Sequence, residues 1–562
     1  MTHMLLAPEA MAAGAADVAR IRSVIVDAGT AAASVTTGVL APAGDEVSAA
    51  AATLFTACAR EYHAVLEQAV AFQGRFADVL AAADDAYTQT EVASAAALVA
   101  SEGPRAGAVV AVSLIMGGTS PSGSAPSSAF AQEIYDDYVK PHFTTTNVQG
   151  LTTTGLFYPA TGVKSPTLDV SVHQSVLTLD NAIQRQLTLG TPVSVFGVSQ
   201  SAVVASLEMT NLANAHVPPG DVTFVLVDNP MNPNGGMLSR FPGLSFPSLG
   251  LTFYGATPAN TGYQTYSYAF EYDFASDTPR YPINVLADLN SFAGFALYHN
   301  YYPNPSALPP GSELVTLPTS QGYSGGTTYY MITSPNLPLL APLRLIPYVG
   351  NPLADLLQPD LKCLVNWGYG NPDYGWSTGP ADVATPFGFL PPLSDTIALG
   401  PALVSGTQQG IADAYGDFNG TGPHPVTLPH LSLSGLAHPL TAPPAGTSVA
   451  SVVDGIVTRF EASNATVADS FSAALSTAYA TLLPTADITV AVAVSLPSYD
   501  INLVLDGITE MVNGQPLVGL IDAIGLPIAA DLFLIPLLVG FEGIVLLQPL
   551  ITLFTGIEFP GG

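Results

Sequence analysis

The sequence predicts an α/β fold whose sheet is at least partly parallel, preceded by an α-helical hairpin. Runs of β-branched and aromatic residues alternate with helical stretches between residues 106 and 332, which is typical of strands joined by crossover helices. Before them lies an Ala-rich region that has almost no glycine in its two long segments. One strand also runs directly into a tight turn that carries a serine. The roles of the other residues are assigned by their position relative to this serine.

The chain is longer than one hydrophobic core usually supports, at 562 residues, so several structural units are expected. We predict three regions: a helical hairpin over 1–100, the sheet domain over 101–374, and a Pro/Gly-rich and helical extension over 375–562 that packs on or covers the sheet domain. The formal net charge of −30 argues against nucleic acid or an anionic membrane surface as a partner. Hydrophobic residues make up 48% of the chain, which favours contact with a protein or lipid.

Cofactor motifs are not found in the sequence. The two cysteines, Cys58 and Cys363, fall in different predicted regions, so neither a structural disulfide nor a zinc or redox motif is expected. The glycines form neither a dinucleotide-binding nor a P-loop pattern. The first residues lack the basic and apolar regions of an ordinary secretory signal. We therefore expect no cofactor and no metal.

The N-terminal region is expected to form two antiparallel helices, over 8–37 and 44–97. A two-helix hairpin buries too little apolar surface to be stable alone, so it should pair with a helical partner. Three stretches carry a resemblance: Pro8-Glu9, Asp45-Glu-Val-Ser-Ala49 and Tyr87-Thr-Gln-Thr-Glu91. With them, the first hundred residues resemble the N-terminal domain of the mycobacterial PE family.

That resemblance implies export to the cell-envelope surface or beyond by the type VII secretion machinery. Tyr87 and Glu91 match the secretion signal that follows the helical pair in such proteins. It also implies a PPE-family protein as the helical partner, and it implies no catalysis.

The sheet domain begins with the apolar run 106–116, which is of strand length and is expected near the centre of a sheet covered on both faces. A Gly/Ser loop, 117–124, follows. It is either a flexible turn or a loop whose backbone N–H groups complete an oxyanion hole.

A nucleophile elbow is predicted at Pro192-Val-Ser-Val-Phe-Gly-Val-Ser-Gln-Ser201, with Ser199 at the apex. The strand 193–196 enters the turn, and the helix 202–209 leaves it. Small residues must stand two before and two after the serine so that strand and helix can approach each other. The pattern departs from Gly-x-Ser-x-Gly at its last position, where Ser201 replaces glycine.

Further strands are expected over 222–227, 265–270 and 327–332. Ligands of such sheets bind at the carboxyl ends of the strands. Gly118, Ser199 and the residues after Phe270 should all lie at that edge.

A serine hydroxyl needs a histidine to accept its proton and a carboxylate to orient that histidine. In α/β-hydrolases the chain order is serine, acid, histidine. Five histidines follow Ser199: His216, His299, His424, His430 and His438. The first comes too early, directly after the elbow helix, and the last three lie in a Pro/Gly-rich segment outside the sheet. Elimination therefore leaves His299 at the end of a helical stretch.

The acid is expected in Glu271-Tyr-Asp-Phe-Ala-Ser-Asp277, directly after a strand. Asp277 is preferred because Pro279 would hold its loop rigid, and Asp273 is the alternative. Asp228 is a third option, but it opens a turn that is better interpreted as part of a binding cleft. Asp288 lies inside a helical stretch and is set aside.

Several longer stretches in the same order resemble the PE-PPE domain, an α/β-hydrolase region of the serine esterase type that is similar to cutinases. They are Gly117-Gly-Thr119, Gly197-Val-Ser-Gln-Ser201, Asn229-Pro-Met-Asn-Pro-Asn-Gly235, Tyr281-Pro-Ile-Asn-Val-Leu-Ala-Asp-Leu-Asn290 and Asn351-Pro-Leu-Ala-Asp-Leu-Leu-Gln-Pro-Asp-Leu361. The resemblance spans about residues 106–370.

It implies Ser199 as nucleophile, an acid between Asp273 and Asp277, and His299 as base. It also implies an oxyanion hole made by the N–H of Gln200 and a second donor at Gly118 or Thr119. Cutinases commonly brace such sites with disulfides, which this chain cannot form.

In the C-terminal extension, the apolar run 532–540 is expected to be too short to span a membrane. Asp531 and Glu542 bound it and Pro536 interrupts it. No transmembrane span is predicted, and the run is interpreted as a packing surface, with a lipid-facing cover of the cleft as the alternative.

Three functions are compatible with the sequence. The first is a secreted serine esterase or lipase that acts on acyl-ester or lipid substrates through an acyl-enzyme. In the second, an acyltransferase of cell-envelope glycolipids uses the same triad, and an alcohol resolves the acyl-enzyme. The third is a non-catalytic surface protein that retains the fold, because function must be argued from the site rather than the fold.

Overall fold

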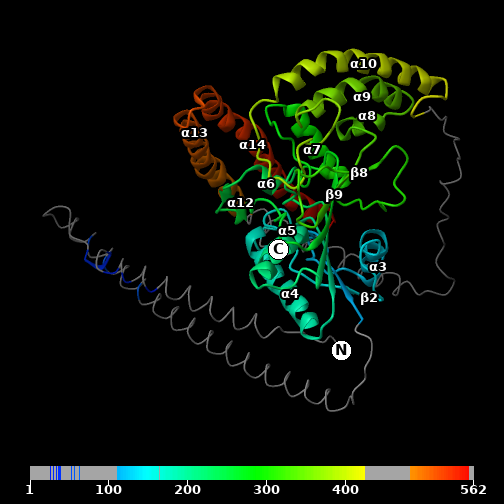
Figure 1. Ribbon diagram of the computed structural model, residues 1–562. Coiled ribbons are helices and arrows are strands. Elements are labelled where there is room, and N and C mark those ends of the chain that lie inside the picture. The colour runs from blue at the N-terminus through cyan, green and yellow to red at the C-terminus, as the bar shows by residue number, and fades with distance from the viewer. Residues whose placement is uncertain are drawn as a thin grey trace, which may run out of the picture. The chain divides into compact units, whose positions relative to one another are not determined.

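The computed structural model of this chain describes residues 110–163, 165–424 and 481–555, and isolated positions between residues 26 and 63 (Figure 1). The chain divides into two compact units, Met1–Ala108 and Val109–Gly562. Within the first, Thr36 Oγ1 lies 3.0 Å from His63 Nε2, so one residue from each predicted helix meets the other there. Most of the predicted hairpin, with Tyr87 and Glu91, lies outside the described residues, as does 425–480. The three predicted region boundaries stay predictions.

A seven-stranded sheet forms the centre of the second unit, in the order β2-β1-β3-β4-β7-β9-β8. Every neighbouring pair is parallel except the edge pair β8 and β9. Its strands are β1 (Val112–Ile115), β2 (Asn147–Gly150), β3 (Val193–Val198), β4 (Val222–Val227), β7 (Gln264–Phe270), β8 (Leu314–Thr316) and β9 (Thr327–Ile332). Ser245–Phe246 (β5) and Leu251–Thr252 (β6) form a separate antiparallel pair. The predicted α/β-hydrolase-like fold is confirmed.

Alternation along the central strands divides the core between the two faces of the sheet, because successive side chains of a strand point to opposite sides. In β3, Val193 and Val195 join the core that contains α4 (Leu168–Thr188) and α5 (Gln200–Asn214). Phe196 and Val198 join the core on the other face, with α3 (Ser128–Ile134) and the π-helical turn η1 (Tyr135–Val139). Burial on both faces explains why these strands have uninterrupted apolar runs.

The remaining helices gather around the carboxyl edge of the sheet and beside it, and Figure 1 shows α8, α9 and α10 in one group and α12, α13 and α14 in another. They are α6 (Met237–Arg240), α7 (Val285–Tyr298), α8 (Ala341–Arg344), α9 (Gly350–Trp367), α10 (Leu393–Phe418), α12 (Leu482–Val490), α13 (Leu496–Val512) and α14 (Pro516–Thr555), with the short turns η2 (Pro338–Leu340) and η3 (Ala491–Ser495).

The long helix α14 corrects one expectation. It continues through Pro527, Pro536 and Pro549 for 40 residues, so Pro536 does not end the apolar segment. By length and composition, Leu482–Val512 and Pro516–Pro549 could each cross a membrane, with mean hydropathies of 1.6 and 2.1. The prediction that no segment could span is therefore wrong on this criterion.

Part of α14 nevertheless packs against the sheet domain. Phe533 is fully buried and stacks on Phe292 of α7, with ring centroids 5.2 Å apart, and on Phe241 at 5.3 Å. Because α7 leads to His299, this contact supports the element that positions the histidine.

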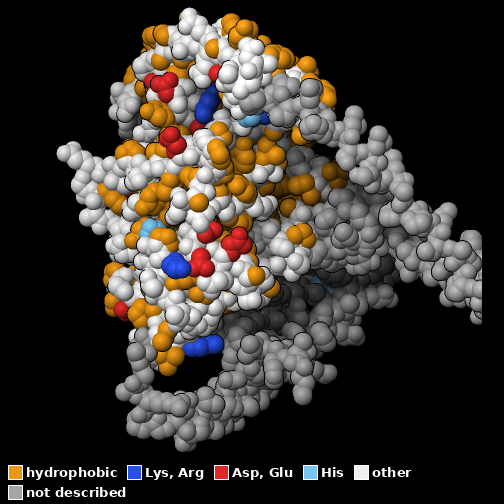
Figure 2. Space-filling model, turned by 90° about the vertical axis from the view of Figure 1, so that its right-hand side faces the viewer, with side chains coloured by type: hydrophobic (Ala, Val, Ile, Leu, Met, Phe, Trp, Pro, Cys, Tyr) orange, Lys and Arg blue, Asp and Glu red, His pale blue; other side chains and the backbone are white. Residues whose placement is uncertain are grey.

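Hydrophobic side chains also reach the surface. Figure 2 shows one face of the molecule, on which they are spread widely and charged side chains are few. This agrees with the charged fraction of 10% in the whole sequence.

Candidate active site

Ser199 stands in a strained turn between β3 and α5. Its φ of 54° and ψ of −122° lie in a region that residues with a Cβ rarely adopt. Close approach of the strand and the helix produces this turn. A Cβ built on Gly197 would lie 2.5 Å from the carbonyl oxygen of Ser201, so only glycine fits there. The geometry is that of a nucleophile elbow.

Ser201, which replaces the usual glycine, contributes hydrogen bonds to the elbow. Its hydroxyl accepts from the N–H of Val198 at 2.8 Å and lies 3.0 Å from the carbonyl oxygen of the same residue. The side chain is buried and small enough for this space. A serine at this position therefore connects the end of the strand to the start of the helix.

His299 lies directly after α7 and faces the serine. Its Nε2 is 2.7 Å from Ser199 Oγ. The ring is 5% exposed and stacks on Phe295 with centroids 4.3 Å apart, which fixes its plane. The structure thus brings together the serine and the histidine that the sequence selected.

The carboxylate beside His299 is that of Asp273. Its Oδ2 lies 3.0 Å from His299 Nδ1. The preferred residue, Asp277, is instead turned back into its own loop, where Oδ2 accepts from the N–H of Tyr272 at 3.0 Å. Burial raises the pKa of Asp277 well above its usual value, although the Tyr272 N–H and Arg240 oppose this. The geometry therefore favours the alternative acid over the preferred one.

A glycine in α7 lets this loop approach the helix. A Cβ built on Gly294 would lie 2.0 Å from the carbonyl oxygen of Tyr272, so the backbone of the acid's loop rests directly on the helix. The approach brings Asp273 within reach of His299. Sequence reasoning did not use this glycine, because its neighbour comes from a distant part of the chain.

The loop that opens at Asp228 packs against the acid's loop. Asn232 donates to the carbonyl oxygen of Ser276 at 3.0 Å, and the N–H of Thr278 donates to that of Gly235 at 2.6 Å. The Ser276 hydroxyl lies 3.2 Å from Asp273 Oδ2. Sequence reasoning missed Ser276, and the signal that could have found it is its place in the same short loop.

Arg240 is another residue that the sequence did not indicate. It is fully buried, and Nε donates to the carbonyl oxygen of Thr278 at 3.1 Å, while NH1 donates to that of Thr385 at 2.6 Å. The guanidinium thereby ties the end of the acid's loop to the segment that follows α9. A buried cation with carbonyl partners restrains both segments.

The residues predicted to form an oxyanion hole lie close to Ser199 in the structure. Gln200 is the first residue of α5, so its N–H has no hydrogen-bond partner within the helix. This N–H lies at the N-terminus of the helix, where the helix dipole places a partial positive charge. A Cβ built on Gly118 would lie 3.3 Å from Ser199 Cβ, which places the loop after β1 against the serine. The Gln200 side chain donates to Thr119 Oγ1 at 3.2 Å and so connects loop and elbow.

Three carboxylate and imidazole groups are close enough to be compared with a metal site. The ligand atoms of Asp228, Asp273 and His299 lie within 4.8 Å of one another. Both nitrogens of His299 are already engaged, one by Asp273 and one by Ser199. The cluster fits a chain of hydrogen bonds better than a cation.

A cavity of about 280 Å³ lies at the end of α7. Its lining includes Tyr298, Tyr301, Ile332 and Pro335, together with the carboxyl-bearing Glu271. Most of these side chains are apolar or aromatic, which suits an apolar group of a ligand. Ser199, Asp273 and His299 are not among its lining residues, and Tyr298 is the neighbour of His299 in the chain.

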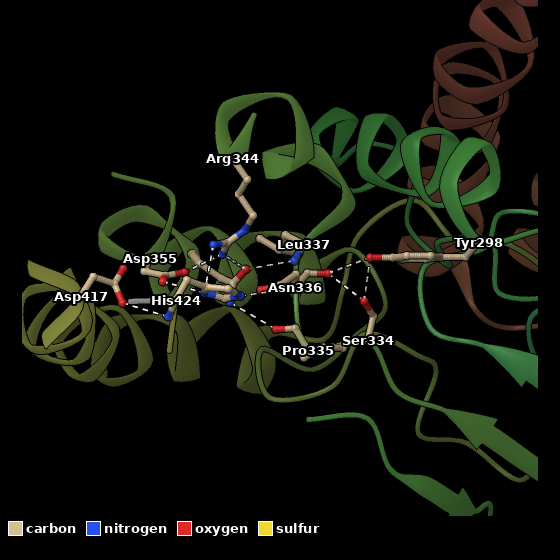
Figure 3. A network of polar contacts seen from close by, with 10 residues as sticks. Tyr298, Ser334, Pro335, Asn336, Leu337, Arg344, Asp355, Asp417 and His424 are labelled. Carbon is tan, nitrogen blue, oxygen red and sulfur yellow. Dashed lines mark hydrogen bonds and ion pairs between the residues drawn. The ribbon is translucent and has the colours of Figure 1, made fainter. Parts of the chain in front are cut away.

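A polar network connects Tyr298 to His424 through Ser334 and Asn336 (Figure 3). The Ser334 hydroxyl donates to the carbonyl oxygen of Asn336 at 2.8 Å and lies 3.1 Å from the Tyr298 hydroxyl. The Asn336 amide lies 3.5 Å from His424 Nε2, at the end of the described part of the chain before 425. The network fastens α8, α9 and the residues after α10 to the end of α7.

Sequence comparisons identify two matching family models. The "PE family" model matches residues 4–94, and the "PE-PPE domain" model matches residues 144–370. Ser199, Asp273 and His299 all lie within the second match. No solved structure was found to match the chain.

Mycobacterium tuberculosis proteins that are similar to this chain include the following three. "PE family protein PE3" is 41% identical over 431 residues, which cover 73% of this chain and 87% of that protein. "Esterase PE16" is 42% identical over 409 residues, covering 72% and 75%. "SL1278 acyltransferase Chp1" is 31% identical over 289 residues, covering 49% and 66%.

Proposed function

Since this chain belongs to the mycobacterial PE family, we propose that it is an exported serine ester hydrolase acting through Ser199, His299 and Asp273. Its PE-PPE domain and its similarity to an esterase and an acyltransferase support action on acyl esters in general. The contact between Ser199 Oγ and His299 Nε2, at 2.7 Å, carries the more specific proposal.

In the proposed reaction, Ser199 Oγ attacks the ester carbonyl carbon while His299 Nε2 accepts the hydroxyl proton. The carboxylate of Asp273 accepts the hydrogen bond from Nδ1–H and stabilises the imidazolium. The carbonyl oxygen becomes an oxyanion beside the N–H of Gln200 and that of Gly118 or Thr119. Collapse of this intermediate releases the alcohol, which takes the proton from His299, and leaves an acyl-enzyme.

Water then attacks the acyl-enzyme, gives its proton to His299, and releases the acid and the free serine. A second candidate function differs only at this step. Similarity to an acyltransferase favours an alcohol as the acceptor in place of water, and in this second proposal the alcohol belongs to a cell-envelope glycolipid. Both reactions need the same triad. Transfer to an alcohol requires in addition that the site keep water away from the acyl-enzyme.

For the N-terminal region we propose its family role. The residues matched by the PE family model would pair with a PPE-family protein, and Tyr87 and Glu91 would be read by the type VII secretion machinery. Residues 1–100, 101–374 and 375–562 remain the proposed division of the chain.

The experiment compares the full chain with Ser199→Ala on short-chain nitrophenyl esters and with a fluorophosphonate probe. The variant should lose at least about 10³-fold in kcat and all labelling, because the residual rate comes from binding and the oxyanion hole alone. Adding a long-chain alcohol and analysing the products separates the two functions: a new ester indicates transfer. If Ser199→Ala hydrolysed and reacted like the parent, both enzymatic functions would be abandoned.

A further inference from the structure

A second buried carboxyl lies behind the acid of the proposed triad. Asp228 directly follows β4, as Ser199 follows β3 and the acid's loop follows β7. These three strands are neighbours in the sheet, in the order β3-β4-β7. Since parallel strands end at the same edge, Asp228 stands between the serine and Asp273.

The distances show how close the carboxyls are. One side-chain atom each of Asp228, Asp273 and His299 lies within 4.8 Å of the others, and both aspartates are 0% exposed. The Ser276 hydroxyl lies between the carboxyls, 3.3 Å from Asp228 Oδ1 and 3.2 Å from Asp273 Oδ2. It has one proton and therefore donates to one of them at a time.

One oxygen of Asp228, Oδ2, is buried and has no hydrogen-bond partner in the described part of the chain. A buried ionised oxygen without a donor is costly, and a second ionised carboxylate at this distance raises the cost further. A proton on Asp228 removes both penalties, because the carboxyl then becomes a donor.

The other groups around Asp228 do not compensate a second negative charge. Besides Asp273, two tyrosines lie near Asp228: Tyr138 in η1 and Tyr302 after α7. A negative charge on Asp228 raises the pKa of both tyrosines. His299 faces Asp273, and Arg240 acts on Asp277. Burial raises the pKa of Asp228 well above its ordinary value, and the carboxylate of Asp273 raises it further, while the Ser276 hydroxyl opposes this.

We propose that Asp228 is a positioning residue for the reaction: it stays protonated at neutral pH and shares that proton with Asp273, so that the two carboxyls together carry one negative charge. The inference rests on the proposed function, because it assigns a role beside the same triad. Asp273 accepts from the N–H of Ala275 through Oδ1 at 3.2 Å, and Oδ2 is left facing His299.

The shared proton has a consequence for pH dependence. When Asp228 loses it at high pH, a second negative charge appears beside the imidazole and repels Asp273 from its position. The basic side of the activity profile should therefore contain an ionisation that belongs to the pair rather than to one residue.

Asp228→Asn is the conservative variant. The residue has a φ of 47°, a conformation that asparagine tolerates, and the amide can donate to Asp273 but cannot ionise. The matched control is Asp288→Asn, another buried carboxyl, in the first turn of α7, whose pKa burial also raises well above its usual value.

The experiment measures kcat and KM of the full chain on a nitrophenyl ester between about pH 5 and 10. We expect Asp228→Asn to keep kcat within about threefold at pH 7 and to lose the basic limb, while Asp228→Ala drops kcat about tenfold or more with KM unchanged. Asp288→Asn should retain the parent profile. An Asp228→Asn profile identical to the parent would overturn the proposal.

Asp228 would instead be the catalytic acid if Asp228→Asn lost as much activity as Asp273→Asn. A proton NMR spectrum gives a readout that does not depend on turnover: the downfield signal of His299 Nδ1–H should move with pH in the parent and stop moving at high pH in Asp228→Asn. If that signal behaved identically in both, the shared proton would be disproved even if Asp228→Ala failed to fold. Failure of the proposed function appears separately, as an active Ser199→Ala.

Discussion

Two histidine–aspartate pairs in this molecule have nearly the same geometry and different surroundings. His299 Nδ1 lies 3.0 Å from Asp273 Oδ2, and His424 Nδ1 lies 2.8 Å from Asp355 Oδ2. The first pair stands at the carboxyl edge of the sheet, and the second connects α9 to the residues after α10 (Figure 3).

The group at the other nitrogen separates the pairs. His299 Nε2 faces a serine hydroxyl at 2.7 Å, whereas His424 Nε2 faces the Asn336 amide nitrogen at 3.5 Å. The second carboxylate also has an arginine, since Arg344 NH2 donates to Asp355 Oδ1 at 2.6 Å. The second histidine is more exposed as well, with 30% of its side chain accessible against 6% for the first.

A histidine–aspartate contact therefore does not by itself indicate catalysis. In the proposed reaction, the histidine of the first pair passes a proton between Ser199 and a substrate while the acid holds its orientation. Arg344 compensates the negative charge of Asp355 whether or not His424 is protonated. The second pair is therefore expected to stabilise the fold.

The largest effect that would test this contrast is on the first pair. Asp273→Asn should lower kcat on a nitrophenyl ester by about 10³ to 10⁴-fold, because the neutral amide cannot stabilise the imidazolium and its NH2 group can donate to His299 Nδ1, which favours the wrong tautomer. The matched variant Asp277→Asn should stay within a few-fold of the parent, since Asp277 contacts the Tyr272 N–H instead. The reverse result would reassign the acid to Asp277.

A smaller effect, on stability alone, is expected in the second pair. Asp355→Ala leaves the mostly buried guanidinium of Arg344 without its carboxylate, so the free energy of unfolding should fall by about 2 kcal/mol, with kcat nearly unchanged. Thermal melting and ester kinetics on the same preparation measure both. Loss of activity in a variant that melts like the parent would give the second pair a part in catalysis.

The smallest effect is a pH dependence. Burial alone would raise the pKa of Asp355, but hydrogen bonds from Arg344, His424 and Asp417 outweigh it and hold the pKa below its ordinary value of 3.8. A depressed carboxyl pKa stabilises the fold above the unfolded value and loses this contribution as the pH falls through the folded one. The difference in melting temperature between the parent and Asp355→Asn should therefore shrink below about pH 4. A constant difference down to pH 2 would show that charge has no part in it.

Local features of the sequence predicted the elbow and the central strands. Gly197, Ser199 and the apolar run before them specify a strand and a turn within ten residues, and β4 was predicted over 222–227, as the structure has it. His299 was reached by elimination among few histidines. These conclusions needed no knowledge of distant contacts.

The acid could not be chosen in the same way. Asp273 and Asp277 lie in one loop, and the approach of that loop to Gly294 determines which of them faces His299. Pro536 was interpreted as an interruption by its local propensity alone, but the helix continues through it in the structure. In both cases packing between distant segments decided the outcome.

Packing of Phe533 on α7 also has a consequence for how the protein is made. Synthesis proceeds from the N-terminus, so Ser199, Asp273 and His299 leave the ribosome long before Phe533 does. Until then Phe292, which precedes the histidine by two helical turns, lacks the ring that it stacks on in the finished protein. A growing chain therefore contains Ser199, Asp273 and His299 before it contains the brace, and the packing around α7 is completed only after Phe533 has been synthesised.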